Sequence, residues 1–170
     1  MKTLFERYME LDIDKALLNL EMQENYLEYY CYPVFKTIIG FEGCILYCFI
    51  DGYEGRVFAV NPENYGDGGQ IYPLARSFEE FLQLVVACGS VNPVEQIHWM
   101  SQEVFRESVK SVWEYRGEER KIVIDMIQKE LDITPMEDPY AYVKKVQKDF
   151  DGSKIIYSDE YYETLGIERP

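Results

Sequence analysis

Residues 43–88 read GCILYCFIDGYEGRVFAVNPENYGDGGQIYPLARSFEEFLQLVVAC, and this stretch decides the fold class of the chain. Two apolar runs, residues 44–50 and 56–60, flank a loop that contains two glycines. Runs of this length, rich in β-branched and aromatic residues, are typical of strands. A glycine-containing loop between them predicts a β-hairpin, so the two strands are expected to be antiparallel neighbours.

An acidic, glycine-rich loop and a short third strand follow the hairpin. Residues 61–69 read NPENYGDGG, in which Asn-Pro and three glycines favour turns. Residues 70–74 then predict a strand. Pro73 places this strand at the edge of a sheet or marks its end, because proline has no N–H to donate to a neighbouring strand.

The helix that comes next has clear start and stop signals. Ser77 and Glu80 have the spacing of a capping box, which satisfies free backbone N–H groups at a helix start. Gly89 stands where a left-handed residue closes a helix. Apolar residues between them form one stripe at helical spacing: Phe78, Phe81, Leu82, Val85 and Val86. Such a stripe needs a surface to cover, so the sequence predicts an α+β fold with helices packed on a central antiparallel β-sheet.

The flanking segments predict further elements. Residues 1–31 favour helix, with Ala16, Leu17 and Leu20 on one face. Residues 34–39 predict a strand that a turn at 40–43 (GFEG) ends. Periodicity and capping residues after Gly89 predict a short helix at 93–100, helices at 102–113, 120–131 and 140–148, a strand at 154–157, and a last helical turn from Ser158 to Gly166.

Length and composition point to one domain. The chain has 170 residues, of which 47% are hydrophobic. We expect a single domain over 1–170, with a core in 33–115 and a mainly helical C-terminal extension in 116–170. The N-terminal residues are charged throughout, and no apolar run approaches the roughly 18 residues of a membrane span. The sequence therefore predicts a cytoplasmic protein without a signal peptide.

The chain is strongly acidic. Its formal net charge is −14, from 17 Lys and Arg against 31 Asp and Glu. A field of this sign repels phosphate backbones and anionic membrane surfaces, so binding to nucleic acid or to membranes is not expected. It favours a basic protein as the partner. The alternative is that the acidity only supports solubility.

The four cysteines predict free thiols rather than a disulfide or a metal site. Cys44 and Cys48 share a predicted strand and lie about 13 Å apart along it, well beyond the roughly 7 Å limit for a disulfide. With Cys31 and Cys88 they lack the two close pairs of a zinc site. The acidic loop residues do not have the spacing of a calcium-binding EF-hand. We expect neither a metal nor a cofactor.

One candidate site residue is His98, the only histidine. It lies between Ile97 and Trp99 in a predicted apolar turn, which favours a packed, hydrogen-bonded side chain. The alternative is a small hydrolase that uses His98 with a nearby carboxylate or with Cys88.

Loop tyrosines beside carboxylates form the other candidate site. Aromatic rings next to acidic groups suit a surface that accepts Lys and Arg side chains from a partner. The alternative is that these tyrosines only bridge the core and the solvent. The predicted contact residues are Asp51, Tyr53, Glu54, Tyr65 and Asp67.

The run IYPLARSFEEFL, residues 71–82, resembles the SMI1/KNR4 family, also called the SUKH superfamily. Its members commonly show a strand, then Pro-Leu-Ala, then Ser-Phe-x-x-Phe-Leu at this point. The hairpin with Phe58-Ala59, the Asn-Pro loop and the run NPVEQI at 92–97 are also similar, so the resemblance covers about residues 33–105. The family's usual N-terminal passage, a Leu-Pro followed by a helix that ends in Asn-Gly, is not visible in residues 1–32.

The resemblance implies a mixed α+β domain with a central antiparallel sheet, and it brings no catalytic residues. Many bacterial members are immunity proteins that neutralise polymorphic toxins, often nucleases, and fungal relatives regulate cell-wall synthesis and signalling. Together with the acidic charge, the resemblance predicts a non-enzymatic protein-binding domain, an immunity protein against a basic toxin. A regulatory or scaffold protein without a toxin partner is the alternative.

Overall fold

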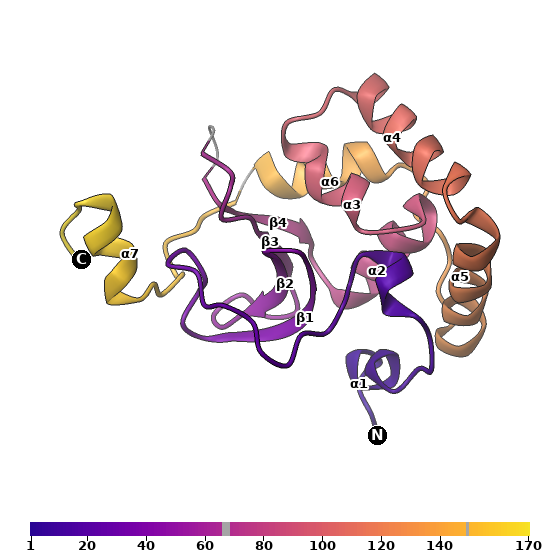
Figure 1. Ribbon diagram of the computed structural model, residues 1–170, viewed down its shortest axis with the longest axis horizontal. Coiled ribbons are helices and arrows are strands. Elements are labelled where there is room, and N and C mark those ends of the chain that lie inside the picture. The colour runs from indigo at the N-terminus through magenta and orange to yellow at the C-terminus, as the bar shows by residue number, and fades with distance from the viewer. Residues whose placement is uncertain (66–68, 149) are drawn as a thin grey trace.

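A four-stranded antiparallel sheet lies at the centre of the computed structural model, which describes residues 1–65, 69–148 and 150–170 (Figure 1). Its spatial order, β1-β2-β3-β4, is also the chain order. The strands are β1 (Lys36–Glu42), β2 (Ile45–Ile50), β3 (Val57–Val60) and β4 (Ile71–Ala75). Pro73 lies in β4 at the sheet edge, as the sequence predicted.

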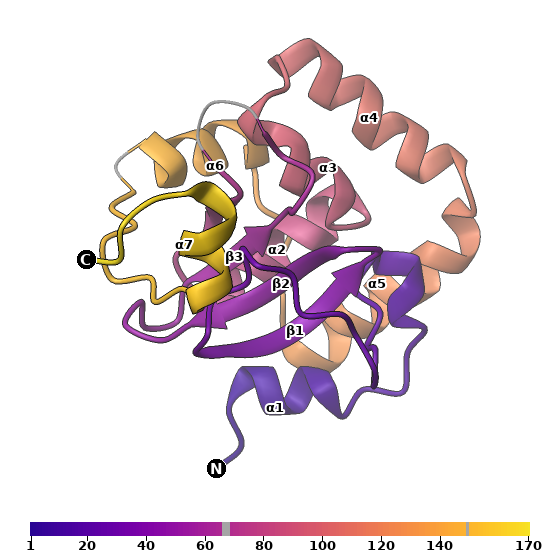
Figure 2. The same ribbon diagram turned by 60° about the vertical axis from the view of Figure 1, so that its left-hand side comes forward.

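Helices surround the sheet and make up most of the C-terminal half. They are α1 (Leu4–Met9), α2 (Phe78–Cys88), α3 (Asn92–Glu95), α4 (Gln102–Glu114), α5 (Gly117–Leu131), α6 (Pro139–Lys148) and α7 (Asp159–Leu165), with short 3-10 turns η1 (Lys15–Leu18) and η2 (Gln96–His98). Figures 1 and 2 both show α7 on the side of the sheet away from α4 and α5. The α+β class predicted from the sequence is confirmed.

Helix α2 forms where its capping residues predicted it. The Ser77 hydroxyl accepts a hydrogen bond from the Glu80 N–H at 3.1 Å. The Glu80 carboxylate accepts a hydrogen bond from the Ser77 hydroxyl at 3.2 Å and not from the Ser77 backbone N–H. The capping box is therefore only half formed. Gly89 closes the helix at φ 80°, and Phe81, Leu82 and Val85 are fully buried.

Side chains alternate across the sheet and build one core on each face. Tyr47, Val57 and Ala59 belong to the larger core beneath the helices, whereas Cys48 and Phe58 belong to a smaller core on the opposite face. This alternation is the period of two that an extended chain imposes. The segment 116–170 contributes to both cores, through Val123, Ile124, Ile127, Leu131, Ile133 and Val143 in the larger one and Ile155 in the smaller one.

The predicted turn at 40–43 is wrong. Strand β1 continues to Glu42, and the hairpin turns at Gly43 and Cys44, with Gly43 at φ 58°. Gly40 lies inside the strand, where the pairing register shifts after Ile38. A glycine in a strand marks either a turn or a bulge, and here it marks a bulge.

Two other predicted elements differ from the structure. Residues 1–31 contain only α1 and η1, and residues 19–35 are mostly irregular, with an isolated bridge from Glu21 to Phe41. Residues 154–157 are not a strand, although the Ile156 carbonyl accepts a backbone hydrogen bond from Val34 at 2.9 Å. Apolar and β-branched residues can also pack on a sheet from an irregular segment. Their pattern alone therefore predicts more regular secondary structure than the chain forms.

Two further predictions concern cysteines and membranes. All four cysteines are free, as predicted, with Cys31, Cys48 and Cys88 buried and Cys44 half-buried. None of the helices in the described ranges has the length and apolar character required to span a bilayer.

Candidate partner-binding site

The two loops that carry the predicted contact residues lie at opposite ends of β3. Residues 51–56 lead into β3 and residues 61–70 lead out of it. A four-residue strand is roughly 13 Å long, so the loops are separated by at least that strand. Asp51 and Glu54 are exposed at one end, Tyr65 is exposed at the other, and Asp67 lies outside the described residues.

Tyr53 is half-buried and holds the C-terminal segment against the hairpin loop. Its hydroxyl donates to the Asp151 carbonyl at 2.6 Å and accepts from the Lys154 N–H at 3.0 Å. Its ring packs against Phe58 and Phe150, with centroids 5.3 and 5.5 Å away. These contacts occupy both the polar and the apolar part of the side chain, so the structure gives Tyr53 a packing role.

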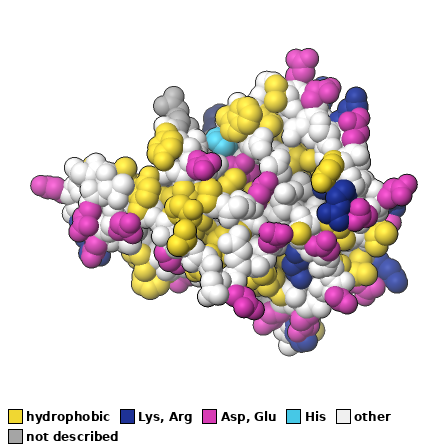
Figure 3. Space-filling model, viewed as in Figure 1, with side chains coloured by type: hydrophobic (Ala, Val, Ile, Leu, Met, Phe, Trp, Pro, Cys, Tyr) yellow, Lys and Arg dark blue, Asp and Glu magenta, His cyan; other side chains and the backbone are white. Residues whose placement is uncertain are grey.

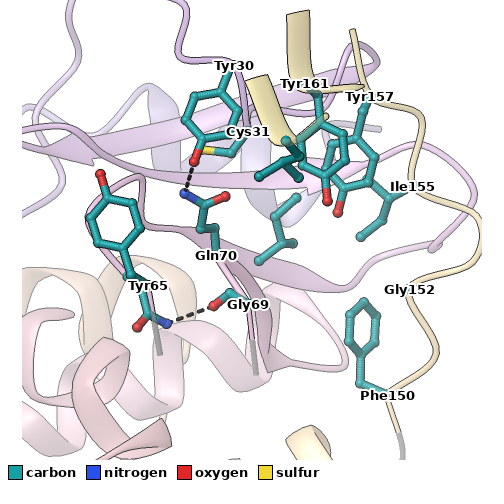
Figure 4. Close-up of a pocket in the computed structure, with 13 residues that line it drawn as sticks. Tyr30, Cys31, Tyr65, Gly69, Gln70, Phe150, Gly152, Ile155, Tyr157 and Tyr161 are labelled. Carbon is teal, nitrogen blue, oxygen red and sulfur yellow. Dashed lines mark hydrogen bonds between the residues drawn. The ribbon is translucent and has the colours of Figure 1, made fainter. Parts of the chain in front are cut away.

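Tyr65, with 85% of its surface exposed, borders an open cavity of about 500 Å³ (Figure 4). Segments far apart in the sequence form the cavity: residues 30–31, 64–65 with 69–71, 150–157 and helix α7. The described residues that line it include no charged side chain. Aromatic side chains dominate the lining: Tyr30, Tyr65, Phe150, Tyr157 and Tyr161.

Gln70 provides a polar group in this cavity, beneath Tyr30 (Figure 4). Its Nε2 donates to the Tyr30 hydroxyl at 2.7 Å and to the Pro62 carbonyl at 3.0 Å. Because a carbonyl can only accept, the Pro62 contact fixes which end of the amide is nitrogen. Among the described residues, the hydrogen bonds of the amide involve only Nε2, which leaves Oε1 as an acceptor for a group that enters the cavity.

Stacked tyrosines hold the wall that α7 contributes. The rings of Tyr157 and Tyr161 are parallel within 9°, with centroids 3.8 Å apart, and Tyr162 meets Tyr161 edge to face. Burial, followed by the neighbouring Tyr161, raises the pKa of Tyr157. No residue of α7 is buried, so these ring contacts, rather than core packing, position the helix.

His98 is packed beside Asn64, in the loop that follows β3, and is hydrogen-bonded as the sequence predicted. Its Nδ1 lies 2.9 Å from the Glu95 carbonyl and its Nε2 lies 3.3 Å from Nδ2 of Asn64. The carbonyl can only accept, so Nδ1 carries the proton and Nε2 accepts from the Asn64 amide. Both ring nitrogens are thus engaged, and the ring packs against that of Tyr72, with centroids 4.2 Å apart and planes inclined by 36°.

Trp99 adds a second exposed aromatic side chain that sequence reasoning did not select. It is 61% exposed, and Figure 3 shows hydrophobic side chains on both sides of the single histidine. Its neighbours Ile97 and Met100 are buried, so local periodicity gives no signal that Trp99 faces the solvent. Only the way in which η2 packs against α3, α4 and α6 decides its orientation.

Two carboxylates, the buried Glu95 and the half-buried Glu42, fasten α3 to the sheet. Glu95, 2% exposed, accepts hydrogen bonds from the Tyr72 hydroxyl and from Asn61 at 3.2 Å. Glu42 accepts from Asn92 at 2.7 Å and from the Tyr47 hydroxyl at 3.1 Å. Burial raises the pKa of Glu42, and the charge of Glu95 adds to this effect. Sequence reasoning could not choose this pair among 31 acidic residues.

The raised pKa of Glu42 predicts a pH-dependent contribution to stability. The folded protein binds this proton more tightly than the unfolded chain does, so the contribution is complete below the unfolded pKa and is lost as the pH rises through the folded pKa. We expect Glu42→Gln to remove this contribution. Urea unfolding between pH 4 and 7 measures this. The free energy of unfolding of the variant minus that of the wild type should increase as the pH rises.

The exposed Glu107→Gln serves as the control for that measurement, since its side chain lies on the solvent side of α4. A free-energy difference between Glu42→Gln and the wild type that is constant over this pH range would contradict the prediction.

The chain matches no protein-family model, no curated protein and no solved structure. The fold and the site therefore describe an α+β protein with an aromatic cavity, and its function has to be argued from that geometry.

Proposed function

We propose that this protein is a non-enzymatic protein-binding domain, an immunity protein that neutralises a basic toxin. The observation that carries the proposal is the tyrosine-lined cavity, with Tyr65 exposed at its rim and Trp99 exposed nearby. Tyrosine and tryptophan are enriched among the residues that carry most of the energy of protein interfaces. A cavity beside them offers a place for a side chain of the partner.

The chemistry of the cavity suits the side chain of an arginine or a lysine. Aromatic faces attract cations, and the apolar walls cover the aliphatic part of such a side chain. Oε1 of Gln70, which has no partner among the described residues, accepts a hydrogen bond from its charged end. The net charge of −14 steers a basic partner toward the protein and speeds association.

The resemblance of residues 71–82 to the SMI1/KNR4 family supports the same proposal, since immunity proteins are common in that family. A regulatory or scaffold protein would use the same cavity with a different partner. The hydrolase alternative has less support, because both nitrogens of His98 are engaged by a carbonyl and an amide. Burial also raises the pKa of Cys88 to about 12, which keeps that thiol protonated at neutral pH.

A tagged pull-down from the source organism, washed with increasing salt and analysed by mass spectrometry, is the first test of the proposal. We expect one basic partner that dissociates as the salt concentration rises. The partner is then purified, and its toxic activity is assayed with and without one equivalent of this protein. Inhibition supports the immunity function, and a partner whose activity does not change would overturn it.

Tyr65→Ala is expected to weaken binding of that partner by about thirtyfold, or roughly 2 kcal/mol, because an exposed aromatic anchor is lost. Stability should stay within about 0.5 kcal/mol of the wild type, since the side chain is exposed. Tyr115→Ala is a matched control, because Tyr115 is 70% exposed and follows α4, away from the cavity. Equal affinities of the two variants, measured by titration calorimetry, would exclude Tyr65 from the interface.

A further inference from the structure

A second cavity, of about 350 Å³, lies where η1, the end of α4 and the start of α5 meet. Among the described residues, none lines both this cavity and the tyrosine-lined one. Its character is different, because polar side chains and charged side chains of both signs line it: Asn19, Glu42, Asn92, Ser108, Arg116 and Arg120.

Arg120 is the unusual member of this lining, because its guanidinium is buried and only 5% of the residue is exposed. Its Nε donates to the Leu17 carbonyl at 3.0 Å, and its Nη1 donates to the carbonyls of Val112 and Tyr115. These acceptors are all neutral. Within the described part of the chain, no carboxylate lies at ion-pair distance from Arg120.

The end of α4 compensates part of this buried charge. Val112 and Tyr115 lie at the C-terminal end of that helix, where the helix dipole provides roughly half a negative charge. An arginine cannot give up its proton in a protein, so the rest of the positive charge persists. A buried charge without a full counter-charge is costly, and an anion in the adjoining cavity would supply that charge.

Hydrogen-bond donors are available for such an anion. The bonds to the three carbonyls leave the Nη2 atom of Arg120 unused within the residues that the structure describes. Arg116 binds Glu119 through Nε at 3.1 Å and Nη2 at 2.6 Å, which leaves its Nη1. The Asn19 amide and the Ser108 hydroxyl line the same cavity.

We propose that this cavity binds a compact oxyanion, a phosphate or carboxylate group of a small molecule, between Arg120 and Arg116. The site is distinct from the proposed toxin-binding cavity and does not depend on it. Its volume suits a small ligand, and the net charge of −14 repels a polyanion such as nucleic acid. The carboxylate of Glu42 also lines the cavity and opposes an anion there.

Inorganic phosphate is the probe for the test. It is titrated into the full-length protein at constant ionic strength, balanced with sodium chloride, and the amide resonances are followed by NMR. We expect saturable shifts of amides around the cavity, among them those of Ser108 and Gly117. A parallel titration with acetate distinguishes the two ligand groups. Tighter binding of acetate assigns a carboxylate ligand, and tighter binding of phosphate assigns a phosphate.

Two variants that remove charges of opposite sign from the lining make the test specific. Arg116→Gln, which keeps a polar side chain but removes the guanidinium, should weaken binding about tenfold, as expected when one charge-assisted hydrogen bond is lost. Glu42→Gln should tighten it, because it removes a negative charge from the lining. Arg169→Gln is the control, since Arg169 pairs with Asp159 beside α7. Shifts that do not saturate, or equal affinities of the Arg116 and Arg169 variants, would overturn the proposal.

Discussion

Replacing Arg120 with methionine is expected to destabilise the fold by about 3–5 kcal/mol, the cost of removing one partner from a buried polar network. The guanidinium, carried by α5, joins carbonyls of η1 and α4, namely those of Leu17, Val112 and Tyr115. Methionine is long and apolar enough to preserve much of the packing of the stem. The three carbonyls would lose their donor, and the loss at the buried Leu17 carbonyl carries the largest desolvation cost.

The neighbouring arginine provides a matched control. Arg116, the residue before α5, is 43% exposed at its side chain and pairs with Glu119 in the first turn of that helix. Because solvent-exposed ion pairs contribute little, Arg116→Met should cost less than about 1 kcal/mol. Urea unfolding followed by circular dichroism measures both variants. If Arg120→Met were no less stable than Arg116→Met, the network around Arg120 would not be holding the three elements together.

Gly40→Ala is expected to cost about 2–3 kcal/mol, because a methyl group at this position has no room. A Cβ atom on Gly40 would lie 2.9 Å from both the carbonyl carbon and the oxygen of Leu20. These are backbone atoms, so no side-chain rotation relieves the contact. The next residues, Glu21 and Phe41, exchange backbone hydrogen bonds of 3.0 and 2.8 Å, which fix the distance between the two segments.

Gly117→Ala is the control for this substitution. Gly117 is the first residue of α5, and a Cβ there would meet no atom within 4 Å. Alanine favours helix over glycine, so this variant should be as stable as the wild type or slightly more stable. Thermal unfolding compares the two. Equal melting temperatures for Gly40→Ala and Gly117→Ala would show that the segment around Leu20 yields to the added methyl group.

Helix α2 and the strands next to it could be predicted because their signals are local. Ser77 and Gly89 each act on backbone groups within one turn of the helix end, and the apolar stripe between them has the helical period. Pro73 places β4 at an edge for a reason internal to the residue, its missing N–H. Such signals need no knowledge of what the element packs against.

The bulge in β1 shows where local signals end. Ile39 faces the larger core and Phe41 faces the smaller one, although residues two apart on a regular strand share a face. The register shift between Ile38 and Gly40 accounts for this change of face. The local pattern GFEG indicates a turn at Gly40, because the need for a residue without a side chain there arises from Leu20, twenty residues earlier.

The candidate site could be predicted only in part. Tyr65 was selected from its loop, and the structure exposes it at the rim of a cavity. Tyr53 was selected on the same grounds, but the segment 150–154 covers it. Neither the cavity nor Trp99 could be found in the sequence, because both depend on how distant segments pack.

The sequence by itself determined the α+β class, the helix α2, the edge position of β4 and the acidic charge, since each follows from composition or from interactions between residues close in the chain. The tertiary structure alone decided which polar groups meet: Glu42 with Asn92, Glu95 with Tyr72, and Arg120 with Leu17. These partners are 50, 23 and 103 residues apart. Burial makes such pairs strong, and burial is a property of the packed chain rather than of any segment within it.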